Sequence, residues 1–363
     1  MNILFFVESG LGNATLLVDQ LTALYKKHKS VHVILSDNDQ EYGLTDRIKG
    51  LSIRYTILPG IYGHHSFTKE AQTLNQIIEQ EQINIVHVQT NWELALIAYI
   101  KYILRCKQQF KTLYTIHGYR NNKKYKKYIA LFLLIIALWL FTDRIICTCS
   151  SLKKQFKILS RKIILLPLGI DDNFFFPKYC TMPDNNLRLI YPAQFRIGKN
   201  QDLVIKAFAQ YIQITNDTNA ILYLPGSGEF LPEMKKLTDS LNLNKQIIFP
   251  GRISKKEILN LYRQCNTAII ASSNETFGQC IVEPYVLGLN IITTNVGVAP
   301  DIITDKINGR YFKTQKELID ILLYFHNNPN KIHEFGMYNY KRKDVFTWDN
   351  ITDKYIEQLS TLK

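Results

Sequence analysis

Two glutamates eight residues apart are the strongest chemical signal in the sequence. The pattern places Glu275 in a loop and Glu283 inside the helix that follows, with the first N–H groups of that helix between them. A carboxylate that accepts hydrogen bonds from a vicinal diol is a common way to hold a ribose, which favours Glu283 for that task. Glu275 would then reach hydroxyls on a second ring, such as a sugar. The alternative is a helix-capping pair in which one glutamate is simply solvated.

Two cations stand in a loop that follows another predicted strand. The stretch Pro192–Asn200 contains Arg196 and Lys199 directly before a predicted helix. Cations at this position can neutralise a diphosphate leaving group as its negative charge develops. We expect help from main-chain N–H groups at the start of the glutamate-bearing helix, those of Phe277, Gly278 and Gln279. A solvated loop remains the alternative.

Glycines also follow the first predicted strand. The stretch Glu8–Asn13 contains Gly10 and Gly12, and glycines at a helix start let main-chain N–H groups approach a phosphate or a sugar. The pattern partly fits the dinucleotide motif G-x-G-x-x-G, with Thr15 at the third glycine position and Asp37 after the second strand. A dinucleotide site and a plain tight turn both remain open.

Two histidines are expected at the carboxyl edge of the first sheet. His87 ends one predicted strand and His117 follows another. A histidine there can hold a sugar hydroxyl or act as an acid or base, although a structural role is the alternative for each.

The elements that must position these residues follow from short apolar runs rich in β-branched and aromatic residues, typical of buried parallel strands. In the first half they predict strands at Ile3–Val7, Val31–Leu35, Ile53–Leu58, Ile83–Val88, Thr112–Ile116 and Arg144–Thr148, with helices at Leu16–Tyr25, Lys69–Glu79 and Leu94–Leu104. A second set predicts strands at Leu187–Ala193, Ala220–Leu224, Gln246–Pro250, Thr267–Ala271 and Asn290–Thr294, with helices at Asp202–Ile212, Leu231–Leu241, Lys255–Gln264, Gln279–Leu287 and Gln315–His326.

This alternation predicts an α/β fold with two Rossmann-like, doubly wound domains facing each other across a cleft. We place the domains at 1–166 and 167–345, and expect 346–363 to form a helix that packs back on the N-terminal domain. Ligands of open α/β sheets bind at the carboxyl ends of the strands, where the glutamates, cations and histidines are expected.

The positive charge is concentrated in one part of the chain. From Leu94 to Ile170 there are fifteen Lys and Arg residues and a single acid, Asp143, although the whole chain carries only +13. This window favours an anionic partner, with a solvated lysine-rich face as the alternative.

Inside the basic window lies an uninterrupted apolar stretch, Ile129–Phe141. Thirteen residues form a helix of about 20 Å, too short for a hydrocarbon core of about 30 Å. The stretch is either a buried core helix or a helix lying in the membrane interface. The second interpretation fits the basic flank that precedes it, which contains Lys123, Lys124, Lys126 and Lys127.

Composition excludes several classes of protein. The 363 residues are 46% apolar and 21% charged, which argues against a disordered, collagen-like or polytopic membrane chain. Six scattered cysteines without metal-binding spacing suggest reduced thiols and a cytoplasmic setting. No signal peptide is expected, because the apolar start ends at Glu8.

Taken together, these residues resemble the GT-B glycosyltransferases of retaining family 4. Glu275 to Glu283 resembles the family's Glu-x7-Glu motif, in which the first acid contacts the donor sugar and the second the ribose. Lys199 matches the family's donor-phosphate lysine. The family's arginine is replaced by Gln194, with Arg196 as a stand-in.

The resemblance extends to other turns and to the first domain. Pro225–Glu229 resembles the family's Gly-x-Gly turn, Thr294–Asp301 its Gly-Gly-x-Pro-Glu segment, and Leu166–Asp171 its interdomain segment. In the first domain it implies that Gly12 and Asn13 lie near the donor phosphates and that His117 contacts the donor sugar.

The resemblance implies a retaining glycosyltransferase, hexosyltransferase-type, that uses a nucleotide-diphosphate sugar, with a UDP-sugar favoured and without a cofactor or a bound metal. The basic window suggests a lipid-linked or membrane-associated saccharide acceptor, as in bacterial O-antigen, capsule or lipopolysaccharide assembly. We expect a cytoplasmic protein, peripheral on the inner face of the membrane, that binds no nucleic acid. The alternatives are an NAD-dependent oxidoreductase and a non-catalytic basic module that binds membrane or nucleic acid.

Overall fold

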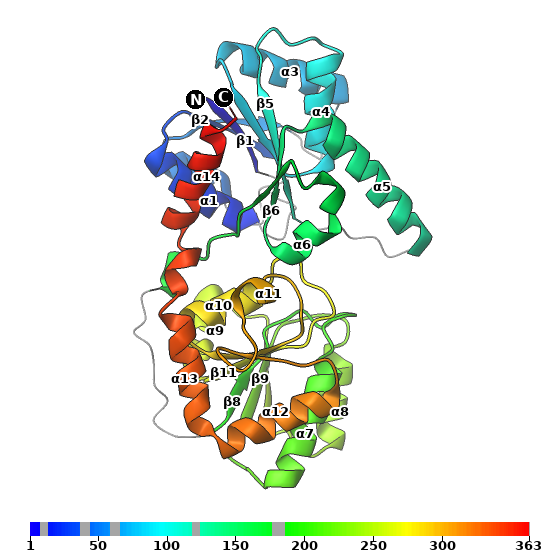
Figure 1. Cartoon of the computed structure of the whole chain (residues 1–363), viewed down its shortest axis with the longest axis vertical. Helices are drawn as coiled ribbons and strands as arrows, with labels where there is room; N and C mark the ends of the chain where they lie inside the picture. Colours follow the sequence, from blue (N-terminus) through cyan, green and yellow to red (C-terminus); the bar gives the residue numbers. More distant parts are fainter. Residues whose placement is uncertain (8–13, 37–43, 59–65, 118–123, 176–185, 363) are drawn as a thin grey trace. The chain divides into compact units, whose positions relative to one another are not determined.

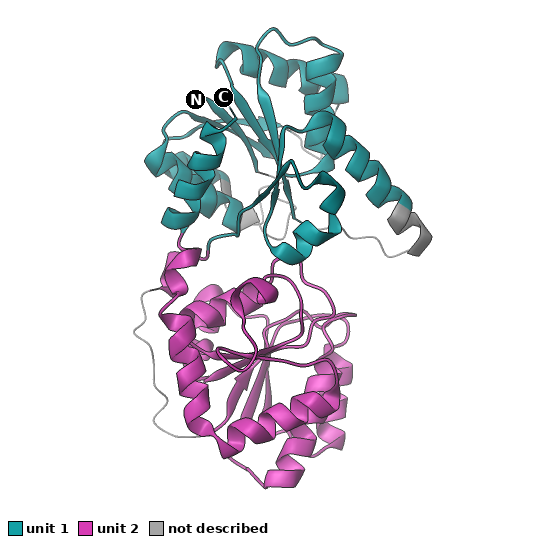
Figure 2. Ribbon diagram, in the orientation of Figure 1, with its two compact units in different colours: residues 1–169, 348–363 teal, residues 170–347 magenta. Residues whose placement is uncertain are grey.

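The computed structural model describes residues 1–7, 14–36, 44–58, 66–117, 124–175 and 186–362, without the side chains of 14, 15, 36, 44 and 124–128. It divides into two compact units (Figure 2). The first comprises Met1–Gly169 and Trp348–Lys363, and the second Ile170–Thr347. The chain therefore passes between the units twice.

The chain leaves the first unit after Gly169 and returns to it at Trp348, in each case a few residues later than the domain ends expected at 166 and 345. A Cβ atom added to Gly169 would lie 2.4 Å from the Trp348 indole, so this glycine and this tryptophan pack directly against each other. That contact keeps 167–169 and the start of the last helix in the first unit. Ile170 N donates to Phe346 O at 3.1 Å inside the second unit.

The first unit is built on a parallel sheet of seven strands in the order β3-β2-β1-β4-β5-β6-β7. Helices α1, α2 and α14 lie on one face, and α3, α4 and α5 on the other (Figure 1). The strands are β1 Ile3–Val7, β2 Val31–Ser36, β3 Arg54–Leu58, β4 Ile85–Val88, β5 Lys111–Ile116, β6 Arg144–Cys147 and β7 Ile163–Leu165. The helices are α1 Ala14–Lys27, α2 Leu44–Gly50, α3 Phe67–Gln80, α4 Asn91–Tyr102, α5 Lys124–Phe141, α6 Ser150–Gln155 and α14 Trp348–Ser360, with a 3-10 turn at Lys157–Leu159.

The second unit repeats this plan with six parallel strands in the order β10-β9-β8-β11-β12-β13. The strands are β8 Arg188–Ile190, β9 Ile221–Pro225, β10 Ile247–Gly251, β11 Thr267–Ile270, β12 Asn290–Thr293 and β13 Arg310–Tyr311. The helices are α7 Gln201–Thr215, α8 Leu231–Ser240, α9 Lys255–Tyr262, α10 Gln279–Leu287, α11 Ala299–Ile302, α12 Gln315–Asn327 and α13 Pro329–Tyr340, with 3-10 turns at Asp172–Phe174 and Lys343–Phe346. The predicted α/β class with two doubly wound units is confirmed.

Burial explains why these segments form strands. All residues of β1, β4, β11 and β12 are buried, as expected for parallel strands covered by helices on both faces. Three helices begin with reciprocal capping boxes, at Thr90 and Glu93, Ser254 and Glu257, and Thr314 and Glu317. Helix α10 differs, because its N-cap is Gly278 with φ +93° and no side-chain hydrogen bond caps it within the described residues.

The C-terminal helix α14 belongs to the core of the first unit. It packs beside α1 although more than 300 residues separate them (Figure 1). Tyr355 of α14 reaches the centre of the sheet, where its hydroxyl lies 2.8 Å from Nδ1 of His87. His87 Nε2 lies 2.7 Å from Thr115 Oγ1, so the imidazole links β4, β5 and α14. Within the described residues, no helix combines the length and apolar character that crossing a bilayer requires.

Candidate functional site

The candidate site of the second unit lies where the order of its strands reverses. Strands β8 and β11 are neighbours, and the crossovers that leave them run in opposite directions along the sheet. Open α/β sheets bind ligands at such a switch point, beyond the carboxyl ends of the strands. The loop after β8 carries Lys199, and the loop after β11 carries Glu275. The topology therefore brings together two residues that are 76 positions apart.

Lys199 and Glu275 form an ion pair in which Nζ donates to Oε1. Their side chains are only 10% and 14% exposed, so the pair is largely shielded from water. Ser272 Oγ also donates to Oε1, at 2.7 Å. Among the described residues no hydrogen bond reaches Oε2 of Glu275. One carboxylate oxygen is therefore held by the protein, and the other is available to a ligand hydroxyl.

The two loops are tied to each other by main-chain and side-chain bonds. Asn200 Nδ2 donates to Ala271 O at 2.7 Å, and Ser273 N donates to Gly198 O at 2.8 Å. The buried Tyr191 hydroxyl donates to Lys199 O at 2.7 Å and lies 2.9 Å from Ser272 Oγ. These bonds fix the relative position of the lysine and the glutamate before any ligand binds.

The start of helix α10 is held by close main-chain packing. The Phe277 side chain is buried, and its carbonyl accepts from Val298 N at 2.8 Å. A Cβ atom on Gly297 would lie 2.3 Å from that carbonyl, so only glycine fits there. Phe277, Gly278 and Gln279 therefore lie where the sequence predicts, at a helix start whose N–H groups favour an anion.

Glu283 lies one turn further along α10 and is half-buried. Its Oε2 accepts from the Tyr262 hydroxyl at 3.1 Å, and desolvation raises the pKa of the carboxyl to about 7. Tyr262 is fully buried, so its hydroxyl anchors the Glu283 carboxyl from the core of the second unit. The neighbouring Cys280 lies between the two glutamates, with its Sγ atom 3.8 Å from Glu275 Oε1. Desolvation raises the pKa of the Cys280 thiol, and the Glu275 carboxylate and then Glu283 raise it further.

Arg196 and Lys199 share one tight turn, in which Lys199 N donates to Arg196 O at 3.2 Å. The Nε atom of Arg196 is buried and has no hydrogen-bond partner in the described part of the chain. Gln194 is exposed, and its carbonyl accepts from Gln201 Nε2 at 3.0 Å. The second cation of this turn is therefore Arg196, while Gln194 serves the start of α7.

The histidines of the first unit differ in their surroundings. His87 is completely buried, and burial lowers its pKa to about 3, so it is a neutral structural residue. His117 is half-buried at the carboxyl end of β5, and burial lowers its pKa to about 4. Its Nε2 lies 2.6 Å from Oε1 of the buried Gln89. Gln89 was not expected from sequence, because nothing in a lone glutamine points to a site.

Several predicted residues fall outside the described part of the chain. Gly12, Asn13 and Lys123 belong to the undescribed segments, as do Gly10 and Asp37. Lys124, Lys126 and Lys127 lie in the first turn of α5, and their side chains are not described. Their roles stay predictions.

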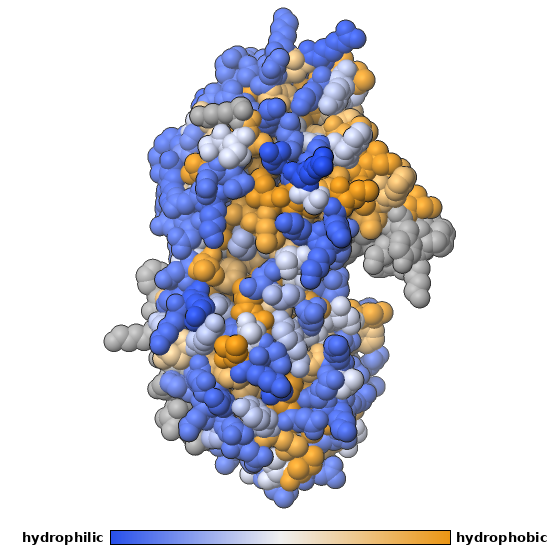
Figure 3. All heavy atoms as spheres, in the orientation of Figure 1, coloured by the Kyte–Doolittle hydropathy of each residue, from blue (hydrophilic) through white to orange (hydrophobic). Residues whose placement is uncertain are grey.

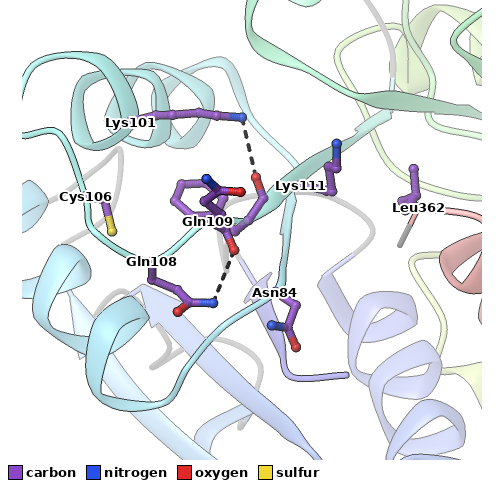
Figure 4. Close-up of a pocket in the computed structure, with 8 residues that line it drawn as sticks. Asn84, Lys101, Cys106, Gln108, Gln109, Lys111 and Leu362 are labelled. Atoms are coloured by element: carbon purple, nitrogen blue, oxygen red, sulfur yellow. Dashed lines mark hydrogen bonds between the residues drawn. The ribbon is translucent and has the colours of Figure 1, made fainter.

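A hollow of about 500 Å³ in the first unit is unrelated to these residues (Figure 4). It lies at the amino ends of β4 and β5, the edge opposite to the one that binds ligands in such sheets. Lys101 and Lys111 on its wall lie within 3.9 and 3.5 Å of Asp143, and Lys101 also donates to Phe110 O at 3.4 Å. The two lysines are therefore already paired within the protein, and their presence in the hollow does not indicate a ligand.

The fold and the switch-point site together define a class of two-domain sugar transferases, the GT-B glycosyltransferases, and solved structures of that class match nearly the whole chain. Anabaena HepE in complex with UDP is 18% identical, with a TM-score of 0.78, and covers 99% of this chain and 100% of its own. The lipopolysaccharide outer core galactosyltransferase WaaB is 13% identical, with a TM-score of 0.75, over the full length of both.

Sequence comparison identifies the family. Glycosyl transferases group 1 matches residues 175–342, and Glycosyltransferase Family 4 matches residues 12–174. The chain belongs to this family of glycosyltransferases, which argues against the oxidoreductase alternative. The Escherichia coli O-antigen biosynthesis glycosyltransferase WclY is 24% identical over 79% of this chain and 81% of its own. An alpha-monoglucosyldiacylglycerol synthase of Streptococcus pneumoniae is also 24% identical, over 80% of this chain and 71% of its own.

Proposed function

We propose that the protein is a retaining, hexosyltransferase-type glycosyltransferase that moves a sugar from a nucleotide-diphosphate sugar to a lipid-linked or membrane-associated saccharide. A UDP-sugar is the favoured donor, and bacterial surface polysaccharide assembly, such as O-antigen, capsule or lipopolysaccharide, is the favoured setting. The similar E. coli enzyme acts in O-antigen biosynthesis, and the similar Anabaena structure contains UDP. The basic window between Leu94 and Ile170 supports an acceptor at an anionic surface.

The observation that carries the proposal is the shielded Lys199–Glu275 pair beside the start of α10, with Oε2 of Glu275 left for a ligand. Glu283 would accept hydrogen bonds from the ribose diol. Lys199, Arg196 and the N–H groups of Gly278 and Gln279 would surround the diphosphate and stabilise the charge that develops on it. Glu275 would hold hydroxyls of the donor sugar, and His117 would approach the same sugar from the first unit.

The proposed reaction occurs on one face of the donor sugar. The bond between C1 and the β-phosphate oxygen breaks, and the acceptor oxygen bonds to C1 from the same side. The acceptor's hydroxyl proton passes to the departing phosphate oxygen, so no enzyme nucleophile is needed and the anomeric configuration is kept. The protein's own cations and N–H groups would supply the positive charge at the diphosphate, so we propose activity without a metal, on the cytoplasmic side of the membrane.

Ligand screening tests the proposal directly. UDP-, GDP- and dTDP-sugars are compared by thermal stabilisation and by slow hydrolysis, with and without EDTA. We expect stabilisation by one nucleotide class, hydrolysis that persists in EDTA, and a released sugar with the donor's anomeric configuration by NMR.

Variants locate the activity. Lys199→Met and Glu275→Gln should abolish hydrolysis, whereas the matched changes at exposed positions, Lys206→Met on α7 and Glu233→Gln on α8, should not. An inverted product, or hydrolysis that survives in both site variants, would overturn the proposal.

A further inference from the structure

Helix α5 presents an apolar face to solvent. Along Ile129–Phe141 every residue is apolar, so the helix lacks the polar outer side that a surface helix normally has. Leu134 and Leu138 face inward and are buried. Six large side chains on the other side are between 37% and 62% exposed, namely Ile129, Phe132, Leu133, Ile136, Trp139 and Leu140. We call these six residues the α5 face.

The spacing of the α5 face is that of a single helical stripe. Successive members are three, one, three, three and one residues apart, which places them together on one side of the helix. The stripe continues onto the end of α4, because the exposed Tyr102 ring lies 5.6 Å from the Phe141 ring and Ile103 beside it is also exposed. Figure 3 shows the apolar side chains gathered along this part of the first unit.

The apolar patch is as large as the largest ones found on typical soluble monomers. Large apolar side chains bury about 150 to 250 Å² each when fully covered. With about half of each of six exposed, the α5 face amounts to about 500 Å² before Tyr102 and Ile103 are added. The largest apolar patch on a typical soluble monomer is about 300 to 600 Å² and is often functional.

The charges around the α5 face identify what covers it. Lys162 Nζ donates to Trp139 O and to Thr142 O at the carboxyl end of the helix. Arg144 follows three residues after the end of the helix, and Lys124, Lys126 and Lys127 lie in its first turn. Cations therefore flank the apolar stripe at both ends, with Asp143 as the single acid in the surrounding sequence from Leu94 to Ile170.

This combination fits an anionic lipid surface better than a second copy of the chain. Two copies pairing through their α5 faces would bring two sets of cations together without acids between them. A bilayer with anionic headgroups offers apolar depth to the stripe and negative charge to its ends. An apolar stripe flanked by Lys and Arg is the composition of helices that lie in the membrane interface.

We propose that α5 is an interfacial membrane anchor that lies parallel to the bilayer and inserts the α5 face to the boundary between headgroups and acyl chains. Leu134 and Leu138 keep the helix attached to the first unit, so the unit is held at the surface without being crossed by lipid. This inference deepens the proposed function, since a lipid-linked acceptor would be met at that surface, and the tests below separate the two.

The first test is flotation of the full-length protein with vesicles of phosphatidylcholine alone or with 30% phosphatidylglycerol. We expect binding to the anionic vesicles, and a loss of at least tenfold in the variant Phe132→Gln/Trp139→Gln. The control Ile214→Gln/Ile248→Gln changes two exposed apolar residues of the second unit and should bind like wild type. Equal flotation of the α5 variant and wild type would overturn the proposal.

The second test uses the native fluorescence of Trp139. Trp348 is buried and Trp92 half-buried, so the response to lipid should come from Trp139. Vesicles should shift its emission to the blue, lipids brominated near the headgroup should quench it more than lipids brominated near the bilayer centre, and Trp139→Phe should remove both effects. An unshifted emission, or a wild-type dimer that the α5 variant converts to a monomer, would refute insertion.

Donor hydrolysis in solution separates this inference from the proposed function. The α5 variant should hydrolyse the sugar nucleotide at the wild-type rate, because α5 lies outside the donor site. Vesicle binding without any hydrolysis would remove the proposed function and leave the anchor, whereas hydrolysis without vesicle binding would do the reverse.

Discussion

Glu283 should make the free protein less stable at alkaline pH than a neutral residue would. Desolvation raises the pKa of its carboxyl from 4.5 to about 7, so the folded state holds this proton more tightly than the unfolded state does. The stabilisation is complete below pH 4.5 and is lost as the pH rises through 7. A difference of about 2.5 pKa units corresponds to at most about 3 to 4 kcal/mol, and solvent screening of a half-buried side chain reduces this free energy to about 1 to 3 kcal/mol.

The variant Glu283→Gln tests this directly, because an amide keeps the shape and accepts from Tyr262 but cannot ionise. Its melting temperature should equal that of wild type at pH 4 and exceed it at pH 8. The second unit has 178 residues, and about 2 to 4 °C per kcal/mol is expected for a domain of this size, which gives a rise of about 2 to 12 °C. The control Glu357→Gln, an exposed carboxyl on α14, should show no such pH dependence.

The same variant should lose affinity for UDP, because a hydrogen bond from ribose to a charged acceptor is worth about 1.5 to 3 kcal/mol, or roughly 10- to 150-fold in affinity. The ratio of wild-type to variant affinity, measured by calorimetry, should rise from pH 6 to pH 8 as Glu283 ionises. The reasoning fails if the melting temperature of the variant lies below that of wild type by the same amount at acidic pH and at pH 8. It also fails if the variant's affinity for UDP is unchanged at pH 8.

Three further substitutions probe other parts of the structure. Lys199→Met should lower stability by about 3 kcal/mol in urea unfolding, because it leaves Glu275 charged and shielded without its cation; an unchanged midpoint would show that the pair is solvated. Gly297→Ala should cost more than about 2 kcal/mol and weaken UDP binding, since its Cβ would lie 2.3 Å from a carbonyl before α10; wild-type values would contradict this close approach. Tyr355→Phe should cost about 1 kcal/mol and speed hydrogen exchange in α14, because the bond to His87 is lost; unchanged protection of α14 would show that the bond does not hold the helix.

The pattern of apolar residues predicts most of the helices and strands because their buried positions are uniformly apolar. Strand β1 and helix α10 were predicted with the bounds that the structure gives, and most other predicted elements differ by a few residues at their ends. Strands β7 and β13 were missed because three and two residues are too few to show a period. Helices α2 and α6 were missed because seven and six residues are too few to show a helical period. Helices α11 and α13 were missed because each begins with an early proline and lacks a strong apolar stripe.

The candidate site shows what sequence reasoning cannot reach. Spacing indicates Glu275 and Glu283, since both lie within one loop and helix. Their partners Lys199 and Tyr262 lie 76 and 21 residues away, and only the strand order brings them close. The sequence could not decide whether the apolar stretch in α5 is a core helix or an interfacial helix. The burial of a helix depends on which other elements pack against it, and the stretch itself does not show this.

The arrangement of the first unit has a consequence for biosynthesis. Its sheet forms from the start of the chain, but Tyr355 and the rest of α14 are made only after the whole of the second unit. Until then His87 lacks its hydroxyl partner and the surface of α1 under α14 stays uncovered. The second unit is continuous in sequence and can complete its fold before α14 is made, so the first unit is begun before the second and completed after it.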